Sequence, residues 1–358
     1  MSARPPLFSF CHNLRASMDQ HLTIPIPAPG FLLASERTES SFEQIPVIDF
    51  TDAASKNPAK RRILADRIRD ACVNVGFFYL KNHPIPESTI AGAISAADDF
   101  FALPDSVKMA LDIHKTANFK GYTALLGENT NPEGRGDLHE GFDIGWEEPG
   151  EGPMAGANVW PREADLPGPF RDRVLAYYQA AVRLGKSLFP LFALALDLPE
   201  DFFDDKTTKP AAIMRLLHYP PQEPAVNDDG RIIGIGAHTD YECFTILWQD
   251  AAGGLQVQNA DGKWIDAVPI PGTFVINLGD QFARWTNDVF KSTLHRVTNR
   301  SGRERYSMPL FFGTDYDVRL EPLPSCVSPG QPARYEVVTA GEYVQQRLAE
   351  TYAQSKGN

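Results

Sequence analysis

A series of short apolar runs between residues 212 and 312 constrains the fold more than any other part of the sequence. Turns rich in Gly, Pro, Asn and Asp separate these runs, and each run has the length of a strand. Short strands that recur in this way are typical of a β-sandwich or a jelly roll. The predicted strands are residues 212–219, 232–238, 243–248, 255–258, 263–268, 273–278, 293–299 and 305–312.

The chain before residue 210 has a different pattern, because its longest periodic segments repeat at helical spacing. Leu64, Ile68 and Cys72 fall on one face of a predicted helix, and a longer helix is predicted over about 169–196. Residues 114–165 are rich in Gly, Pro and Asn and are expected to form a long irregular stretch. The other predicted elements are strands at 45–50 and 76–80 and a helix at 340–354.

These patterns predict a mainly β protein with flanking helices, organised in four regions. Residues 1–44 are expected to be a partly irregular extension, because they show no period. Residues 45–200 are expected to pack on the β core, which occupies residues 201–320. Residues 321–358 form a C-terminal segment that contains a helix.

Composition limits the partners of the chain. The 358 residues carry a formal net charge of -12, which disfavours binding to a phosphate backbone. No run approaches the roughly 20 apolar residues that a membrane span requires. The four cysteines form no Cys-x-x-Cys pair, so a disulfide framework or zinc-cysteine site is not expected. We therefore expect a cytoplasmic protein that binds neither nucleic acid nor membranes; its oligomeric state stays open.

His238-Thr239-Asp240 is the first motif with metal-binding chemistry. Residues two apart on a strand point the same way, so an imidazole and a carboxylate can reach one ion. Alone, the motif is weak evidence, since a histidine bonded to a turn aspartate explains it equally well. His295, in a later β-like run, supplies a possible third ligand. Two histidines and a carboxylate suit Fe(II) with open positions, although Zn²⁺ accepts the same ligands.

Arg305-Tyr306-Ser307 follows in the last predicted strand of the β core. Arg305 and Ser307 share one strand face. A guanidinium binds a carboxylate through two hydrogen bonds, and a hydroxyl adds another donor. The pair therefore suits the distal carboxylate of 2-oxoglutarate, whereas the simpler alternative is a surface arginine on an edge strand.

In their order, these motifs resemble the iron(II)/2-oxoglutarate-dependent dioxygenases of the isopenicillin N synthase-like branch. The resemblance covers roughly residues 45–320 and rests on several further landmarks. They are Ile45-Pro46-Val47-Ile48-Asp49-Phe50, Gly76-Phe77-Phe78-Tyr79-Leu80-Lys81-Asn82-His83, Tyr219-Pro220-Pro221, Gly253-Gly254-Leu255-Gln256-Val257 and Asn277-Leu278-Gly279-Asp280.

The resemblance implies a double-stranded β-helix (jelly-roll) core and a catalytic Fe(II) bound by His238, Asp240 and His295. It also implies that 2-oxoglutarate and O2 are co-substrates, and that Arg305, Ser307 and Tyr219 hold 2-oxoglutarate. The expected reaction is hydroxylation, desaturation or ring closure of a small-molecule metabolite, as in secondary metabolism.

One position departs from the family pattern. Many relatives have an asparagine two residues before the tyrosine of Tyr-Pro-Pro, where this chain has Leu217, so an amide donor to the co-substrate is missing. Tyr219 remains available. An alternative is an iron oxidase of the same branch that does not use 2-oxoglutarate, in which Arg305 and Ser307 grip a substrate carboxylate. A non-catalytic jelly-roll binding protein is a further alternative.

Four residues are candidates for the substrate pocket. The family comparison places His139 and Phe142 near the substrate mouth, and Trp285 is a third candidate. Phe311 shares the strand face of Arg305 and Ser307, so it is expected inside the barrel beside the substrate. The alternative for the aromatic residues is core packing.

Overall fold

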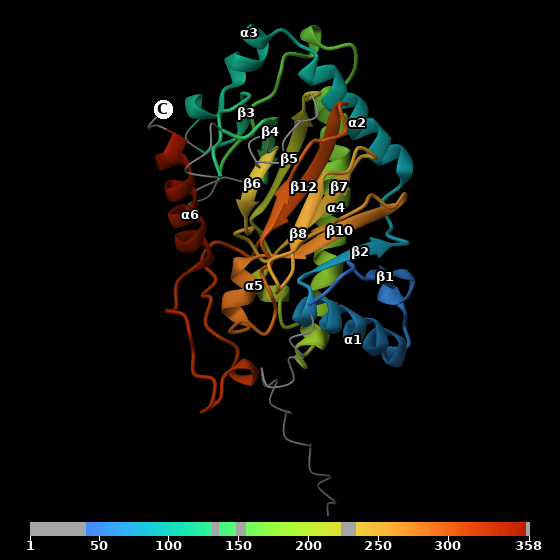
Figure 1. The fold of residues 1–358 in the computed structure, drawn as a ribbon, viewed down its shortest axis with the longest axis vertical. Coiled ribbons are helices and arrows are strands. Elements are labelled where there is room, and N and C mark those ends of the chain that lie inside the picture. Colours follow the sequence, from blue (N-terminus) through green and yellow to red (C-terminus); the bar gives the residue numbers. More distant parts are fainter. Residues whose placement is uncertain (1–40, 117, 131–135, 148–154, 223–233, 356–358) are drawn as a thin grey trace, which may run out of the picture. The chain divides into compact units, whose positions relative to one another are not determined.

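The computed structural model describes residues 41–116, 118–130, 136–147, 155–222 and 234–355, and for the last six of these only the backbone. Most of the predicted N-terminal extension lies outside the described residues. Figure 1 shows a layered arrangement in which helices flank twisted β-sheets.

The larger sheet has eight strands in the order β1-β2-β10-β7-β12-β5-β4-β3. All its neighbouring strands are antiparallel except β1 and β2, which run parallel. Its strands are β1 (Val47–Asp49), β2 (Phe77–Lys81), β3 (Gly121–Thr123), β4 (Glu140–Gly145), β5 (Ala212–Tyr219), β7 (Phe244–Gln249), β10 (Thr273–Leu278) and β12 (Arg305–Phe312).

The smaller sheet has four strands in the order β6-β11-β8-β9, all antiparallel. Strand β11 pairs His295 with His238 of β6 on one side and contacts β8 on the other. The strands are β6 (Ile235–His238), β8 (Leu255–Gln258), β9 (Trp264–Asp266) and β11 (His295–Val297).

Helices cover one face of the larger sheet and bury its apolar side chains in the main core. The longest helix approaches β12 so closely that a Cβ atom at Gly185 would lie 2.4 Å from the ring of Phe312. None of the helices in the described ranges is long and apolar enough to cross a membrane. The helices are α1 (Pro58–Asn74), α2 (Glu87–Phe101), α3 (Asp105–Lys108), α4 (Phe170–Ala195), α5 (Asp280–Trp285) and α6 (Ala340–Ser355). Short 3-10 helices are η2 (Thr51–Ala54), η3 (Met109–Leu111), η4 (Ile113–Lys115), η5 (Glu163–Asp165), η6 (Asp204–Lys206) and η7 (Pro324–Cys326).

The two sheets with flanking helices confirm the predicted jelly-roll core. The prediction for residues 114–165 was wrong in part, because this stretch contains β3 and β4 and extends the larger sheet. Strand β4 pairs with β5 from Glu140 to Gly145. Its buried polar residues, Glu140 and Asp143, conceal the apolar alternation by which a strand is usually recognised.

Candidate active site

A cavity of about 170 Å³ lies between the two sheets. Strands β5, β7 and β12 of the larger sheet and β6, β8 and β11 of the smaller sheet line it. Much of the wall is apolar, with Ile213, Leu247 and Leu255 among its residues. Val344 and Leu348 of α6 form another part of the wall. Apolar walls that carry convergent polar groups are typical of a small-molecule site.

Three potential metal ligands meet in this cavity. His238 ends β6, Asp240 lies two residues later, and His295 begins the neighbouring strand β11. One ligand atom from each residue lies within 4.8 Å of the others. The Oδ1 atom of Asp240 is 3.7 Å from Nε2 of His238 and 3.6 Å from Nε2 of His295. The predicted triad therefore converges on one point.

Hydrogen bonds behind the triad orient its ligand atoms. Oδ2 of Asp240 accepts hydrogen bonds from Thr245 and from Asn277, the latter at 2.6 Å, so Oδ1 faces the two imidazoles. Nδ1 of His238 is 2.8 Å from the carbonyl of Gly236, and Nδ1 of His295 is 3.1 Å from that of Thr293. Nδ1–H donation leaves both Nε2 lone pairs for a metal, an arrangement typical of histidine ligands.

Electrostatics favour the metal-binding protonation states. Burial and the neighbouring His295 lower the pKa of His238 to about 4, so its ring is neutral near pH 7. Burial acts to raise the pKa of Asp240, but His295, His238 and the two hydrogen-bond donors hold it below its ordinary value. A neutral imidazole and an ionised carboxylate are the forms that bind Fe(II) or Zn²⁺.

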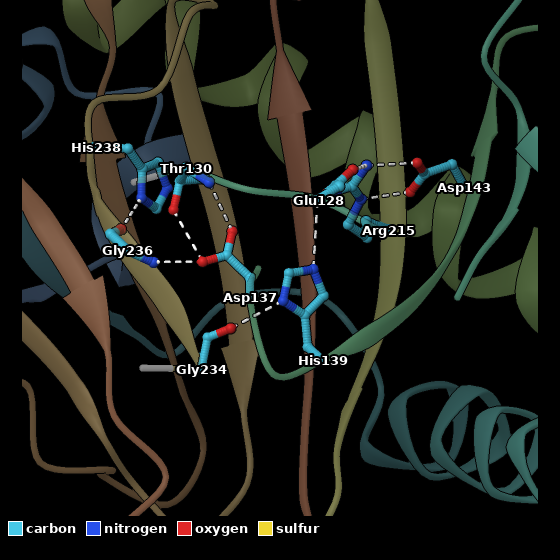
Figure 2. Close-up of polar contacts among 9 residues, drawn as sticks. All are labelled: Glu128, Thr130, Asp137, His139, Asp143, Arg215, Gly234, Gly236 and His238. Atoms are coloured by element: carbon cyan, nitrogen blue, oxygen red, sulfur yellow. Dashed lines mark hydrogen bonds and ion pairs between the residues drawn. The ribbon is translucent and has the colours of Figure 1, made fainter. Parts of the chain in front are cut away.

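A carboxylate further from the cavity supports the strand that carries His238 (Figure 2). Asp137 accepts a hydrogen bond from the backbone N–H of Gly236 at 3.0 Å, and the carbonyl of Gly236 is the contact of His238. Asp137 also accepts hydrogen bonds from the backbone N–H and the hydroxyl of Thr130. This chain of contacts fixes the segment around Thr130 to the metal-ligand strand.

Arg305 is a completely buried cation at another part of the cavity. It lies over the ring of Tyr219 at 4.5 Å and donates hydrogen bonds to the Gly253 carbonyl and to Ser307. Within the described part of the chain, no carboxylate lies within ion-pair distance of its guanidinium. A buried guanidinium without a counter-ion is costly, and this one is therefore suited to bind the carboxylate of a ligand.

The hydroxyl of Tyr219 is a second polar group in this part of the cavity that is available to a ligand, after the guanidinium of Arg305. This hydroxyl is buried and has no hydrogen-bond partner among the described residues. Leu217, which pairs with Ser307 across the strands, adds an apolar wall where an amide was expected in the family pattern. The donors here fit a 2-oxo acid with a distal carboxylate, and the Leu217 position offers no further donor.

Comparison with known proteins identifies the family. The family model of the "non-haem dioxygenase in morphine synthesis N-terminal" region matches residues 45–163, and that of the "2OG-Fe(II) oxygenase superfamily" matches residues 210–314. The chain belongs to the 2OG-Fe(II) oxygenase superfamily. The match confirms the family that the sequence motifs resemble, and the oxygenase uses Fe(II) and 2-oxoglutarate.

Relatives of comparable length support this assignment. The 2-oxoglutarate-Fe(II) type oxidoreductase ppzC of Metarhizium rileyi is 37% identical in an alignment of 334 residues that covers 86% of this chain and 88% of the relative. Homoarginine-6-hydroxylase 2-ODD-233 of Oryza sativa subsp. japonica is 35% identical over 326 residues, covering 86% and 98%. A full-length Neurospora crassa protein, crystallised in complex with alpha-KG and thymine, has a TM-score of 0.77 at 31% identity, covering 86% and 96%.

The oxygenase has a charged wall that sequence reasoning missed (Figure 2). Arg215 of β5 donates to both oxygens of Asp143 at 2.6 Å and to both oxygens of Glu128 at 2.7 and 2.8 Å. All three side chains line the cavity. Period-two spacing could have indicated Arg215, because it lies on the strand face of Leu217 and Tyr219.

His139 lies behind this wall and not in the cavity lining. Its Nε2 atom is 3.3 Å from Glu128, and its Nδ1 atom is 2.9 Å from the Gly234 carbonyl. Burial acts to lower the pKa of His139, but the hydrogen bond and charge of Glu128 hold it above its ordinary value. The prediction that His139 contacts the substrate directly is therefore wrong, because His139 lies outside the cavity lining. It instead supports Glu128, which lines the cavity.

The structure separates the three aromatic candidates. Phe311 is half-buried and lines the cavity together with Ser307 and Pro309, as alternation along β12 predicts. Phe142 instead faces the helices and packs 4.7 Å from the ring of Phe100, because on β4 it alternates with the cavity-lining Asp143. Trp285 was also misassigned to the pocket. It packs in the main core, 5.4 Å from the ring of Phe203.

Glu242 also lines the cavity, although no sequence motif indicates it. It lies two residues after Asp240 in the turn before β7. Burial, and then the charge of Asp240, raise the pKa of Glu242 to about 8. The series His238, Asp240, Glu242 has a spacing of two, but a turn at this point weakens any prediction from strand alternation.

Proposed function

We propose that this oxygenase binds Fe(II) through the triad and 2-oxoglutarate through the donors at the Arg305 part of the cavity. The triad is His238, Asp240 and His295, and the co-substrate residues are Arg305, Ser307 and Tyr219. One observation carries the proposal: a fully buried guanidinium without a carboxylate partner among the described residues shares a cavity with three converging ligand atoms.

The residues around the co-substrate have separate tasks in this proposal. Arg305 binds the distal carboxylate, and Ser307 both accepts from the guanidinium and faces the same cavity. The unpartnered hydroxyl of Tyr219 donates to a further oxygen of the co-substrate. Leu217 and Val297 keep water from this part of the cavity, which strengthens each polar contact.

With Fe(II), 2-oxoglutarate and O2 bound, O2 would be the oxidant: two of its four oxidising equivalents would convert 2-oxoglutarate into succinate and CO2, and the other two would be available for a substrate C–H bond. The protein contributes binding, orientation and exclusion of water. The reaction we propose is hydroxylation, desaturation or ring closure of a small-molecule metabolite, in the cytoplasm and within secondary metabolism. The curated relatives above are named as an oxidoreductase and a hydroxylase, and the Neurospora crassa protein was crystallised with thymine, a small molecule.

Succinate release tests the proposal. Purified protein with Fe(II), O2 and 2-oxoglutarate is expected to release succinate, and Arg305→Ala is expected to need far more 2-oxoglutarate. An oxidase that does not use 2-oxoglutarate would release none while still consuming O2 with its substrate. A binding protein without catalysis would take up neither O2 nor 2-oxoglutarate, and the family membership weighs against both alternatives.

A further inference from the structure

Glu242 is a buried carboxyl group in the cavity that no side chain of another described residue pairs. Its exposed fraction is 8%, and it lines the same cavity as the triad. No described residue forms a side-chain hydrogen bond or ion pair with its carboxylate. A carboxyl group that is buried without a partner from another residue keeps its hydrogen-bonding capacity for a ligand, and a cationic ligand would also compensate its ionised form.

The other acidic residues of the cavity lack this property. Asp143 and Glu128 are each bound through two hydrogen bonds by Arg215. Asp240 accepts from Thr245 and Asn277 and belongs to the triad. Glu242 thus differs from the other acidic residues of the cavity because no side chain of another described residue forms a hydrogen bond or ion pair with it.

Backbone contacts locate Glu242 at the end of the cavity that is opposite to Arg305. The next residue, Cys243, donates from its backbone N–H to the Phe312 carbonyl at 3.1 Å. A Cβ atom at Gly313 would lie 3.2 Å from the Cγ atom of Glu242. Arg305 starts β12 and Phe312 ends it, which separates the two ends by roughly 20 Å at about 3.3 Å per residue.

As far as the described residues extend, the cavity therefore carries a cation without a counter-ion at one end and, at the other, a carboxyl group that no other side chain pairs, and the triad lines the same space. Arg305 suits an anionic co-substrate. At the Phe312 end of β12, Phe311 and its strand partner Ile213 add apolar side chains to the cavity wall. A ligand that fits this end has an apolar body and one positively charged donor group.

We propose that Glu242 binds a cationic nitrogen of the substrate, so that the enzyme selects amines or guanidines over neutral and acidic molecules of the same shape. The inference rests on the proposed function, because it assigns the substrate end of that site. Charge-assisted hydrogen bonds from an ammonium or guanidinium to a carboxylate are shorter and stronger than neutral ones. A site built to pair a charge also rejects analogues that lack it, since they leave the buried group unpaired.

A matched set of small molecules tests this selection. The set contains primary amines and guanidines together with alcohols and carboxylates of the same carbon skeleton, benzylamine, benzyl alcohol and benzoate being one such trio. The measurement is the increase in succinate release that each compound causes, together with its Kd for protein loaded with Fe(II) and 2-oxoglutarate. In wild type we expect the cationic members to bind at least about tenfold more tightly than their counterparts, the ratio that a difference of roughly 1.4 kcal/mol produces.

Two variants connect the preference to Glu242. Glu242→Gln keeps the side-chain shape but cannot carry a negative charge beside a bound cation, so the preference for cations should disappear. Glu242→Asp keeps the charge on a shorter side chain, so part of the preference should persist. Glu321→Gln, at an exposed position outside the cavity, is the matched control and should retain the full preference.

Each outcome bears on the inference. It is overturned if the cationic compounds give no response, if alcohols or carboxylates are preferred, or if the preference persists in Glu242→Gln. If Glu242→Gln does not fold, the inference is tested by the preference of wild type for cations and by the part of that preference that Glu242→Asp retains. Absence of any succinate release from wild type with Fe(II) and 2-oxoglutarate is a different result, because it contradicts the proposed function itself.

Discussion

Asp240 presents its Oδ1 atom to His295 at 3.6 Å from Nε2, while its Oδ2 atom is held by Asn277 and Thr245. We expect Thr245→Val to lower the affinity for Fe(II) by about tenfold to 100-fold, because the carboxylate then loses part of its orientation. Thr245→Ser retains the hydroxyl and should stay close to wild type. Metal content after dialysis against limiting Fe(II) measures the difference, and equal content in the two variants would contradict this role.

Removal of a proposed metal ligand should have a larger effect. We expect His238→Ala, Asp240→Ala and His295→Ala each to abolish turnover and to lose stoichiometric iron, since two remaining ligands do not hold the ion in place. Iron analysis and succinate release check this for each variant. Near-normal iron content and activity in any of the three would show that the ligand set is wrongly assigned.

Arg305→Ala should raise the 2-oxoglutarate concentration needed for half-maximal succinate release by about 30-fold to 150-fold. This range corresponds to the loss of a charged hydrogen-bonded contact of roughly 2–3 kcal/mol. Arg303→Ala, at an exposed position two residues earlier, is the control and should leave the requirement unchanged. An unchanged requirement in the Arg305 variant would favour an oxidase in which Arg305 binds the substrate.

Phe311→Leu should reduce the ratio of oxidised product to succinate with a modest loss of stability. Leucine retains much of the hydrophobic volume, so folding survives. A substrate held less firmly beside Phe311 is misplaced, and a shift of about 1 Å can reduce the rate about 100-fold. The product-to-succinate ratio and the melting temperature are measured together. A lower melting temperature with an unchanged ratio would indicate that Phe311 only fills the barrel.

The ion pair of His139 and Glu128 should make stability depend on pH. The pKa of His139 is raised in the folded protein above its ordinary value of 6.5, so its contribution is complete below about pH 6.5 and is lost as the pH rises through the raised value. The free energy of unfolding should therefore fall above about pH 6.5, by at most about 1.4 kcal/mol per pH unit for one proton. His139→Gln should flatten this decline in thermal unfolding between about pH 6 and 9; parallel curves would contradict it.

Much of the β core could be predicted from sequence because its strands are apolar and end in strong turn residues. Strands β5, β8, β10 and β12 have the predicted bounds. Strand β4 was missed because its polar residues are buried by partners on other elements, as Asp143 is by Arg215. Such compensation depends on contacts between segments far apart in sequence, which periodicity does not reveal.

The same distinction applies to the site. His238 with Asp240, and Arg305 with Ser307, could be proposed as pairs because residues two apart on a strand share a face. His295 was proposed from a later β-like run and from the family resemblance. Phe142 and Trp285 were wrongly assigned to the pocket, since the face on which an aromatic side chain lies depends on strand pairing and helix packing. Glu128 and Glu242 were not recognised because neither their burial nor the presence of partners can be read from sequence.

Helix α6 supplies Val344 and Leu348 to the cavity wall but none of the proposed ligands of iron or 2-oxoglutarate. Tyr343 of this helix donates a hydrogen bond to Asp280 at 2.8 Å, which fastens the wall to α5. Proteolytic cleavage between Phe312 and Ala340 would thus leave every proposed ligand on the larger fragment. Once α6 has dissociated, the larger fragment is expected to consume 2-oxoglutarate without oxidising the substrate that the intact wall retains.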